Sequence, residues 1–148
     1  MDETDRKLLN LSQEDFPIAA EPFAEVGARL GIGEAEVLRR VARLKEEGIV
    51  RRIGAVFDLR KLGFASTLCA ARVPEEKMDA FVATVNAHPG VTHNYRRDDD
   101  YNVWFTLIAP KEEALEAVLE EIKRETGIGD ILSLRAVRTF KINASFEV

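Results

Sequence analysis

Apolar side chains recur at helical spacing through the first third of the chain. Val37, Val41 and Leu44 lie four and three residues apart, so they share one face of a helix expected over residues 34–47. Gly48 is expected to end this helix, because glycine readily adopts the left-handed conformation found at helix C-termini. The pattern therefore predicts a helix that packs one side against other elements.

Two shorter helices are expected before it. The first begins near the N-terminus and ends at the Phe-Pro pair at 16–17, and the second covers residues 22–30, with proline in its first turn. The glycine-containing segment 31–33 then forms a tight turn. This order predicts a helix-turn-helix, followed by a strand pair or wing over residues 49–58.

Beyond about residue 63 the pattern alternates between strand and helix. Strands are expected over residues 67–73, 91–97, 101–109 and 131–142, and helices over residues 74–87 and 110–126. The order β-α-β-β-α-β is that of the ferredoxin-like plait. We therefore predict an α+β chain with a winged helix-turn-helix domain over residues 1–62 and a ferredoxin-like domain over residues 63–148.

The composition excludes several classes of protein. Of the 148 residues 46% are hydrophobic, which is enough to form a folded core. The chain has no run of about 18 apolar residues, and its N-terminus is acidic where a signal peptide is basic, so we expect a cytoplasmic protein without a membrane partner. The net charge of -5 argues against a dedicated nucleic-acid binder, which usually carries a basic surplus.

A polar cluster is expected at the hairpin between residues 91–97 and 101–109. Because side chains alternate between the two faces of a strand, His93, Tyr95 and Arg97 share one side. An imidazole, a phenol and a guanidinium on one face can form an anion-binding acid–base site. The alternative interpretation is a surface strand with a hydrogen-bonded histidine.

Several segments carry motifs rather than periodicity. They are residues 38–50, the insertion over residues 16–23, His93-Asn94-Tyr95-Arg96-Arg97, Tyr101-Asn102-Val103-Trp104-Phe105-Thr106 and Arg138-Thr139-Phe140-Lys141-Ile142. The first segment, with the helix-turn-helix and the plait, resembles the Lrp/AsnC family of feast/famine regulators. The others look like one branch of that family, the sirohaem (also written siroheme) decarboxylases, which include the paired Ahb subunits and the Nir proteins of haem d1 synthesis.

This resemblance implies a carboxy-lyase of the alternative haem biosynthesis pathway. Such an enzyme removes carbon dioxide from two acetate side chains of sirohaem and gives 12,18-didecarboxysirohaem. The resemblance also implies a paralogous subunit as partner, in a heterodimer or a larger oligomer. The conjugated ring of sirohaem can accept the electrons that decarboxylation releases, so no separate cofactor is expected, although haem binding is possible.

The resemblance and the residue types together place the expected active site in the domain over residues 63–148 and suggest roles in it. His93 would donate a proton or, alternatively, bind the haem iron, while Tyr95 would hydrogen-bond the reacting carboxylate and Arg97 would hold it. With two histidines and one cysteine, the chain offers no other metal-ligand set. The expected substrate-binding residues are Arg96, Tyr101, Asn102, Trp104, Arg135, Arg138 and Lys141. Core packing is the alternative role for Trp104, and solvated edge-strand charges are the alternative for Arg135 and Arg138.

Two other functions remain open at this point. One is an Lrp/AsnC-type DNA-binding regulator that senses haem or another small molecule, because cations at positions 39, 40, 43, 45, 51 and 52 could contact phosphates. Glu34 and Glu36 argue against it, since carboxylates at the start of a recognition helix repel the DNA backbone. We therefore expect no nucleic-acid partner. The other is a non-catalytic subunit whose partner carries the chemistry.

Overall fold

The computed structural model describes residues 1–142 and 145–148, and the chain divides into two compact units. Residues 1–55 and the C-terminal residues from Phe140 onward form a helical unit, and residues 56–139 form a sheet unit. The predicted domain division between residues 62 and 63 remains a prediction.

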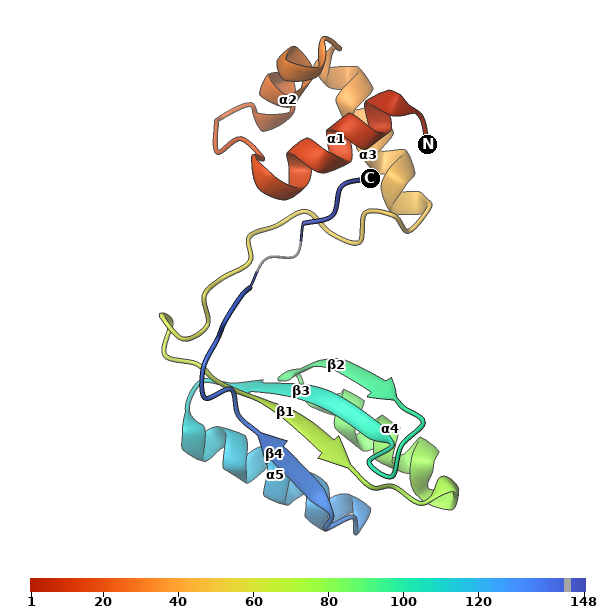
Figure 1. Cartoon of the computed structure of the whole chain (residues 1–148), viewed down its shortest axis with the longest axis vertical. Helices are drawn as coiled ribbons and strands as arrows, with labels where there is room; N and C mark the ends of the chain where they lie inside the picture. Colours follow the sequence, from red (N-terminus) through yellow and green to blue (C-terminus); the bar gives the residue numbers. More distant parts are fainter. Residues whose placement is uncertain (143–144) are drawn as a thin grey trace. The chain divides into compact units, whose positions relative to one another are not determined.

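Three helices make up the body of the helical unit. They are α1 (Glu3–Glu14), α2 (Pro22–Leu30) and α3 (Glu34–Glu46) (Figure 1). Leu8 of α1, Val26 of α2, and Val37 and Leu44 of α3 are buried together at the centre of this unit. The spacing of apolar residues thus selects the buried side of each helix, as the sequence predicts.

Glycine makes the tight turn between α2 and α3 possible. Gly31 ends α2 in the left-handed conformation, with a φ of 71°. Gly27 lies so close to the turn that an added Cβ atom would be 2.6 Å from the carbonyl oxygen of Ile32. Any side chain at position 27 would therefore force the two helices apart. The three helices and this turn confirm the helix-turn-helix prediction.

The predicted wing is wrong, because residues 49–58 form no strand. The backbone N–H groups of Ile49 and Val50 instead bond to the carbonyl oxygen of Leu44, which closes the end of α3. The side chains of Val56 and Phe57 are exposed. A strand is stable only when its backbone groups are paired with a neighbour, and this segment has none among the residues that the structure describes.

The sheet unit has the topology that the strand and helix order predicts. Strands β1 (Ala65–Ala71), β2 (Val91–Arg96), β3 (Val103–Ala109) and β4 (Ile131–Leu134) form an antiparallel sheet in the order β2-β3-β1-β4. The short 3-10 helix η1 (Glu75–Lys77) leads into α4 (Met78–Ala87), and α5 (Glu112–Thr126) joins β3 to β4. The ferredoxin-like plait is therefore confirmed.

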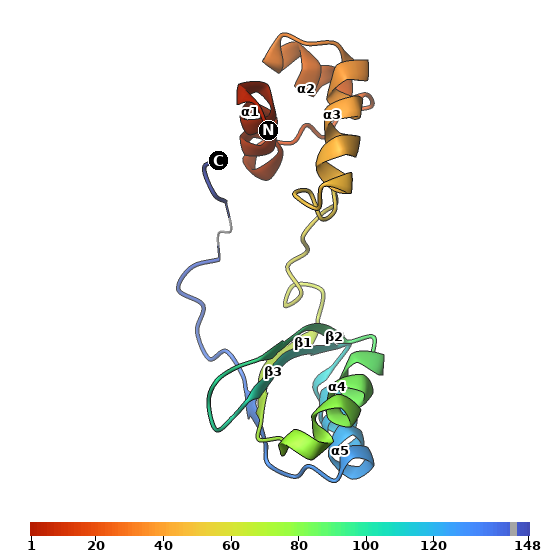
Figure 2. The same cartoon turned by 90° about the vertical axis from the view of Figure 1, so that its right-hand side faces the viewer.

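Helices α4 and α5 cover one face of this sheet (Figure 2). On the covered face Phe105 packs edge-to-face with Phe81 of α4, with ring centroids 6.3 Å apart. Phe105, Leu107 and Cys69 are buried there with Leu115 of α5. Burial raises the pKa of the Cys69 thiol to about 12, so this cysteine stays a neutral core residue.

The last strand is shorter than predicted. It was expected over residues 131–142, but β4 ends at Leu134. Its four residues pair with Leu68–Ala71 of β1. Residues Ala65, Ser66 and Thr67 of β1 pair with β3 but not with β4, so the pairing of β4 stops before β1 itself begins. Arg138 and Lys141 therefore follow the sheet rather than lie in it.

Candidate active site on the open face of the sheet

The face of the sheet opposite to α4 and α5 carries the predicted acid–base residues. In β3 the buried residues alternate with half-buried ones, and Trp104 and Thr106 belong to the half-buried set. Tyr95 pairs with Trp104, and His93 pairs with Thr106. Residues directly opposite each other in a sheet point to the same side. His93 and Tyr95 therefore lie on the open face, where the alternation of the sequence puts them.

The rings of His93 and Tyr95 lie against each other. Their centroids are 6.1 Å apart and their planes differ by 28°. The Nδ1 atom of His93 lies 3.1 Å from the Thr92 hydroxyl oxygen, and 55% of Tyr95 is exposed. An accessible imidazole beside a phenol can exchange protons with a bound molecule. This pair is the acid–base part of the candidate site.

Arg97 and Trp104 supply a cation and an apolar surface beside this pair. The Arg97 guanidinium lies 5.4 Å from the centroid of the Trp104 ring. Trp104 is itself held in place, because its indole N–H donates to the carbonyl oxygen of Tyr101 at 2.6 Å. A guanidinium fixed over an aromatic ring keeps donors available for a carboxylate. Arg97 and Trp104 therefore form the anion-binding part of the candidate site.

The Asn102 side chain is hydrogen-bonded to the backbone just beyond the end of β1. Its Nδ2 atom donates to the carbonyl oxygen of Val73 at 2.8 Å, and its Oδ1 atom accepts from the Val73 N–H at 2.9 Å. Its carbonyl oxygen accepts from the N–H of Arg97 at 2.9 Å. The structure thus gives Asn102 a positioning role, and direct contact with a substrate remains a prediction.

Tyr101 belongs to a second polar cluster at the end of β1. Its hydroxyl donates to Asp130 at 3.0 Å, and this hydrogen bond to a carboxylate raises the pKa of the phenol. The Arg72 guanidinium lies 5.2 Å from the centroid of the Tyr101 ring and 3.5 Å from Asp130. Arg72 and Asp130 were missed by sequence reasoning, because no motif connects two residues 58 positions apart.

Two of the predicted substrate-binding residues are paired with carboxylates of the chain itself. Arg96 lies on the covered side of β2 and makes a bidentate pair with Glu75, at 3.0 and 2.8 Å. Arg135 contacts Glu112 and Glu116. The structure therefore does not bring Arg96 and Arg135 together with His93, and their binding roles remain predictions.

The remaining predicted cations follow the sheet. Arg138 belongs to the sheet unit and Lys141 to the helical unit. Their roles in substrate binding also remain predictions.

The loop of the hairpin encloses a shallow hollow. It is lined by Arg96, Arg97, Asp98, Asp99 and Asn102. Both signs of charge meet there, so the hollow favours a molecule that has both acidic groups and hydrogen-bond donors. Among the described residues, no group of three or more His, Cys, Asp or Glu side chains could hold a metal ion. None of the described helices is long and apolar enough to cross a membrane.

Both parts of the chain match known protein families. Residues 5–51 match the siroheme decarboxylase NirDL-like helix-turn-helix domain, and residues 61–141 match the AsnC-like ligand binding domain. The siroheme decarboxylase alpha subunit of Desulfovibrio desulfuricans is 56% identical over 148 residues, which cover all of this chain and 85% of that one.

Solved structures agree with these matches. The siroheme decarboxylase NirDL is 39% identical with a TM-score of 0.74, and the match covers 98% of this chain but 47% of the NirDL chain. This chain thus spans about half of that protein. An AsnC family transcriptional regulator from Agrobacterium tumefaciens is 26% identical with a TM-score of 0.78, over 99% of this chain and 96% of that one. With a NirDL-like helix-turn-helix and an AsnC-like ligand-binding domain, the chain belongs to the siroheme decarboxylase family.

Proposed function

We propose that this chain is a subunit of an enzyme that removes carbon dioxide from two acetate side chains of sirohaem. The product would be 12,18-didecarboxysirohaem. The observation that carries the proposal is the set of His93, Tyr95, Arg97 and Trp104 on one open sheet face. The named relatives support it, and NirDL has also been solved with an iron-uroporphyrin III analogue.

The first task of the site is to hold a flat, carboxylate-rimmed macrocycle. The exposed apolar side chains of the open face and the Trp104 indole would contact the ring. Arg97 would bind a peripheral carboxylate, because charge-assisted hydrogen bonds from guanidinium to carboxylate are strong and directional. Fixing one carboxylate in this way orients the acetate that reacts.

The second task is to supply a proton. Breaking the bond between the acetate methylene and its carboxylate releases carbon dioxide and leaves an electron pair on the methylene carbon. The conjugated ring of the substrate can delocalise this pair, and His93 would then donate a proton that converts the carbon to a methyl group. Tyr95, stacked on His93, would hydrogen-bond the reacting carboxylate. No cofactor beyond the substrate is required for this step.

His93 has a second possible role in the same site. Its imidazole could bind the iron of the substrate, since histidine is a common iron ligand. In that case the ring would be fixed above the sheet by coordination, and the proton would come from Tyr95 or from solvent. The absorption spectrum of bound sirohaem distinguishes the two roles, because loss of an axial ligand changes it.

The partner would be a paralogous chain that covers the open face. Leu68, Leu132 and Leu134 lie side by side on β1 and β4 of this face, and each is at least 40% exposed. A contiguous apolar patch of this kind is typical of protein interfaces. Relatives are themselves named as alpha, NirG and NirD subunits. A second chain would also shield the bound macrocycle from water.

One experiment tests the proposal. The purified chain, alone and with its paralogue, is incubated with sirohaem without oxygen, and the products are analysed by mass spectrometry. We expect a species lighter by two carbon dioxide units in the mixture. If neither sample forms it while the macrocycle stays intact, the proposal is wrong. Product from the mixture that persists with His93→Ala would leave the chain as a non-catalytic subunit.

A further inference from the structure

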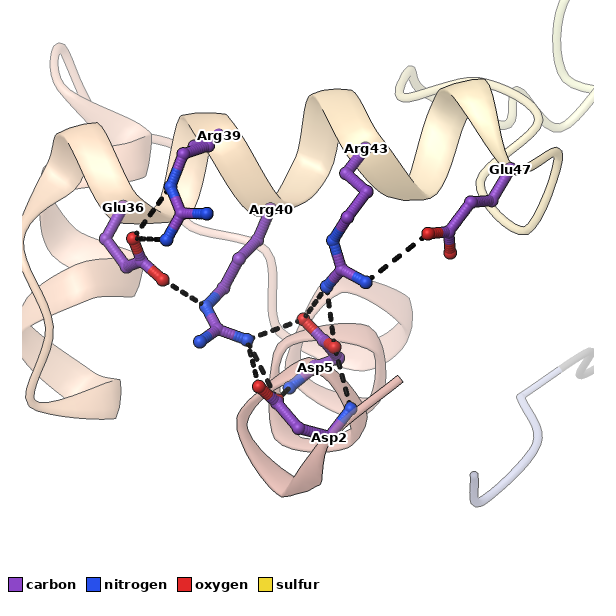
Figure 3. A network of polar contacts seen from close by, with 7 residues as sticks. All are labelled: Asp2, Asp5, Glu36, Arg39, Arg40, Arg43 and Glu47. Atoms are coloured by element: carbon purple, nitrogen blue, oxygen red, sulfur yellow. Dashed lines mark hydrogen bonds and ion pairs between the residues drawn. The ribbon is translucent and has the colours of Figure 1, made fainter.

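Three arginines on α3 form ion pairs with carboxylates of the helical unit (Figure 3). This arginine row consists of Arg39, Arg40 and Arg43, which are one and three residues apart. In DNA-binding helix-turn-helix proteins the second helix of the motif lies in the major groove, and nearby cations neutralise phosphates. The partners of these arginines decide whether α3 can do the same.

Arg40 is the most heavily engaged of the three. Its Nη1 atom lies 2.8 Å from both carboxylate oxygens of Asp2 and 2.8 Å from Oδ1 of Asp5. Its Nε atom donates to Glu36 at 2.6 Å. Only 16% of the Arg40 side chain is exposed. This guanidinium is therefore turned toward the N-terminal end of α1 and away from solvent (Figure 3).

Arg43 and Arg39 are paired in the same network. Nη2 of Arg43 donates to both oxygens of Asp5 at 2.7 Å, and its Nη1 atom lies 3.4 Å from Glu47. Arg39 contacts Glu36. The three arginines thus face four carboxylates, and the network carries a net negative charge (Figure 3).

Asp5 makes the pairings of Arg40 and Arg43 hard to exchange. Its side chain is 1% exposed, and its Oδ2 atom accepts from the backbone N–H of Asp2 in the capping box that begins α1. Burial alone would raise the pKa of Asp5. The hydrogen bonds from Arg43, the Asp2 backbone and Arg40 outweigh this effect and hold the pKa well below its usual range, so the carboxylate is charged at neutral pH. An arginine that left for a phosphate would leave a buried carboxylate unpaired, which is strongly unfavourable.

We propose that Asp2, Asp5 and Glu36 form an acid clamp that masks the arginine row of α3, and that this masking keeps the helix-turn-helix from binding the phosphate backbone of DNA. The clamp occupies the positions that phosphates would take. The capacity to bind a polyanion is thus present in α3 but blocked from within the chain. This inference does not depend on the decarboxylase proposal, because it concerns only contacts within the helical unit.

The test compares two double variants of the full chain with the same change in charge. Asp2→Asn with Glu36→Gln weakens the clamp. Asp15→Asn with Glu25→Gln is the matched control, because these exposed carboxylates pair with Arg29 of α2. Binding to a short duplex DNA of arbitrary sequence is followed by fluorescence anisotropy over a range of salt concentrations.

We expect no salt-dependent binding by the unmodified chain. The clamp variant should bind at least about tenfold more tightly than the control, with a steeper dependence on salt, because each phosphate contact releases counterions. Binding by the unmodified chain as tight as that of the clamp variant would overturn the inference. So would a clamp variant that binds no better than the control.

A pair of single variants keeps the test usable if the double variant fails to fold. Glu36→Gln alone leaves Asp2 and Asp5 in place and removes one carboxylate from both Arg39 and Arg40. Glu25→Gln alone is its control. Circular dichroism verifies that each variant retains its helices. The same ordering of affinities is expected, and equal affinities for the two single variants would contradict the inference.

Discussion

The side-chain amide of Asn102 bonds to both backbone groups of Val73, so the residue that precedes β3 holds the chain just beyond the end of β1. Through its own carbonyl oxygen Asn102 also accepts from the N–H of Arg97. Asn102 therefore links the backbone next to the candidate anion-binding arginine, through its own backbone, to the chain beyond β1, through its side chain.

Asn102→Ala should destabilise the sheet unit and lower activity together. Two partly buried backbone groups of Val73 would lose their partner, which costs about 1–3 kcal/mol. Urea unfolding followed by the fluorescence of Trp104 measures this loss. Asn86→Ala is the matched control, because the exposed Asn86 side chain accepts a hydrogen bond from the Asn94 side chain rather than from the backbone. Equal losses of stability and activity in the two variants would contradict the positioning role of Asn102.

His93→Ala should lower turnover about a hundredfold, the usual contribution of one acid–base group. His88→Ala is the control, since its backbone N–H ends α4 and its side chain is not part of the candidate site. Turnover with sirohaem and the paralogous subunit is the measurement. An unchanged spectrum of bound sirohaem in His93→Ala would identify the residue as an acid, whereas a shifted spectrum would identify an iron ligand.

Arg97→Ala should weaken substrate binding more than Arg96→Ala does. The two arginines are neighbours, but Arg97 lies over Trp104 on the open face while Arg96 is paired with Glu75. Loss of a charge-assisted hydrogen bond corresponds to about a tenfold or larger rise in KM. Steady-state kinetics of both variants gives the comparison. A larger KM effect from Arg96→Ala would place the substrate on the other side of the hairpin.

The helical unit should lose stability in acid through Asp5. Its pKa is lower in the folded than in the unfolded chain, so its contribution is complete above about pH 4, the range of an ordinary aspartate, and is lost as the pH falls below that. Asp5→Asn should cost about 3 kcal/mol at neutral pH and flatten this acid dependence. Hydrogen exchange of α1 and α3 amides measures both effects. Asp15→Asn, on an exposed carboxylate, should change neither.

Leu132→Glu should disrupt association with the paralogous subunit. This leucine is 40% exposed on the open face, and a charge there would be buried by any chain that covers the face. Analytical ultracentrifugation of the mixed subunits is the measurement. Ile18→Glu introduces the same charge at a fully exposed apolar residue of the helical unit. Association that survives Leu132→Glu unchanged would exclude the open face as the interface.

The elements with strong local signals were predictable from the sequence. The helices follow from apolar spacing and from glycines such as Gly31. In β3 six of the seven residues are apolar, so the sequence did not show which of them face the core. The wing and the long last strand were wrong, because β propensity at Ile53 or Val137 does not reveal whether a neighbouring strand exists.

The contacts between distant residues were not predictable. The sequence separates Asp5 from Arg43 by 38 positions and Val73 from Asn102 by 29. No periodicity connects such pairs, and their polar side chains look like ordinary surface residues. Alternation did place His93 and Tyr95 on one face, because that relationship is local to β2, and Arg97 directly follows this strand.

A single irregularity in β2 allows that strand to serve two surfaces. The register shifts between Val91 and His93, so that Val91 pairs with Leu107 and packs against the core while His93 pairs with Thr106. In a regular strand two residues two positions apart would share a face, and either Val91 would be lost from the core or His93 would be buried in it. The extra residue, Thr92, thus lets one strand pack against the helices through Val91 and expose the His93 imidazole on the open face.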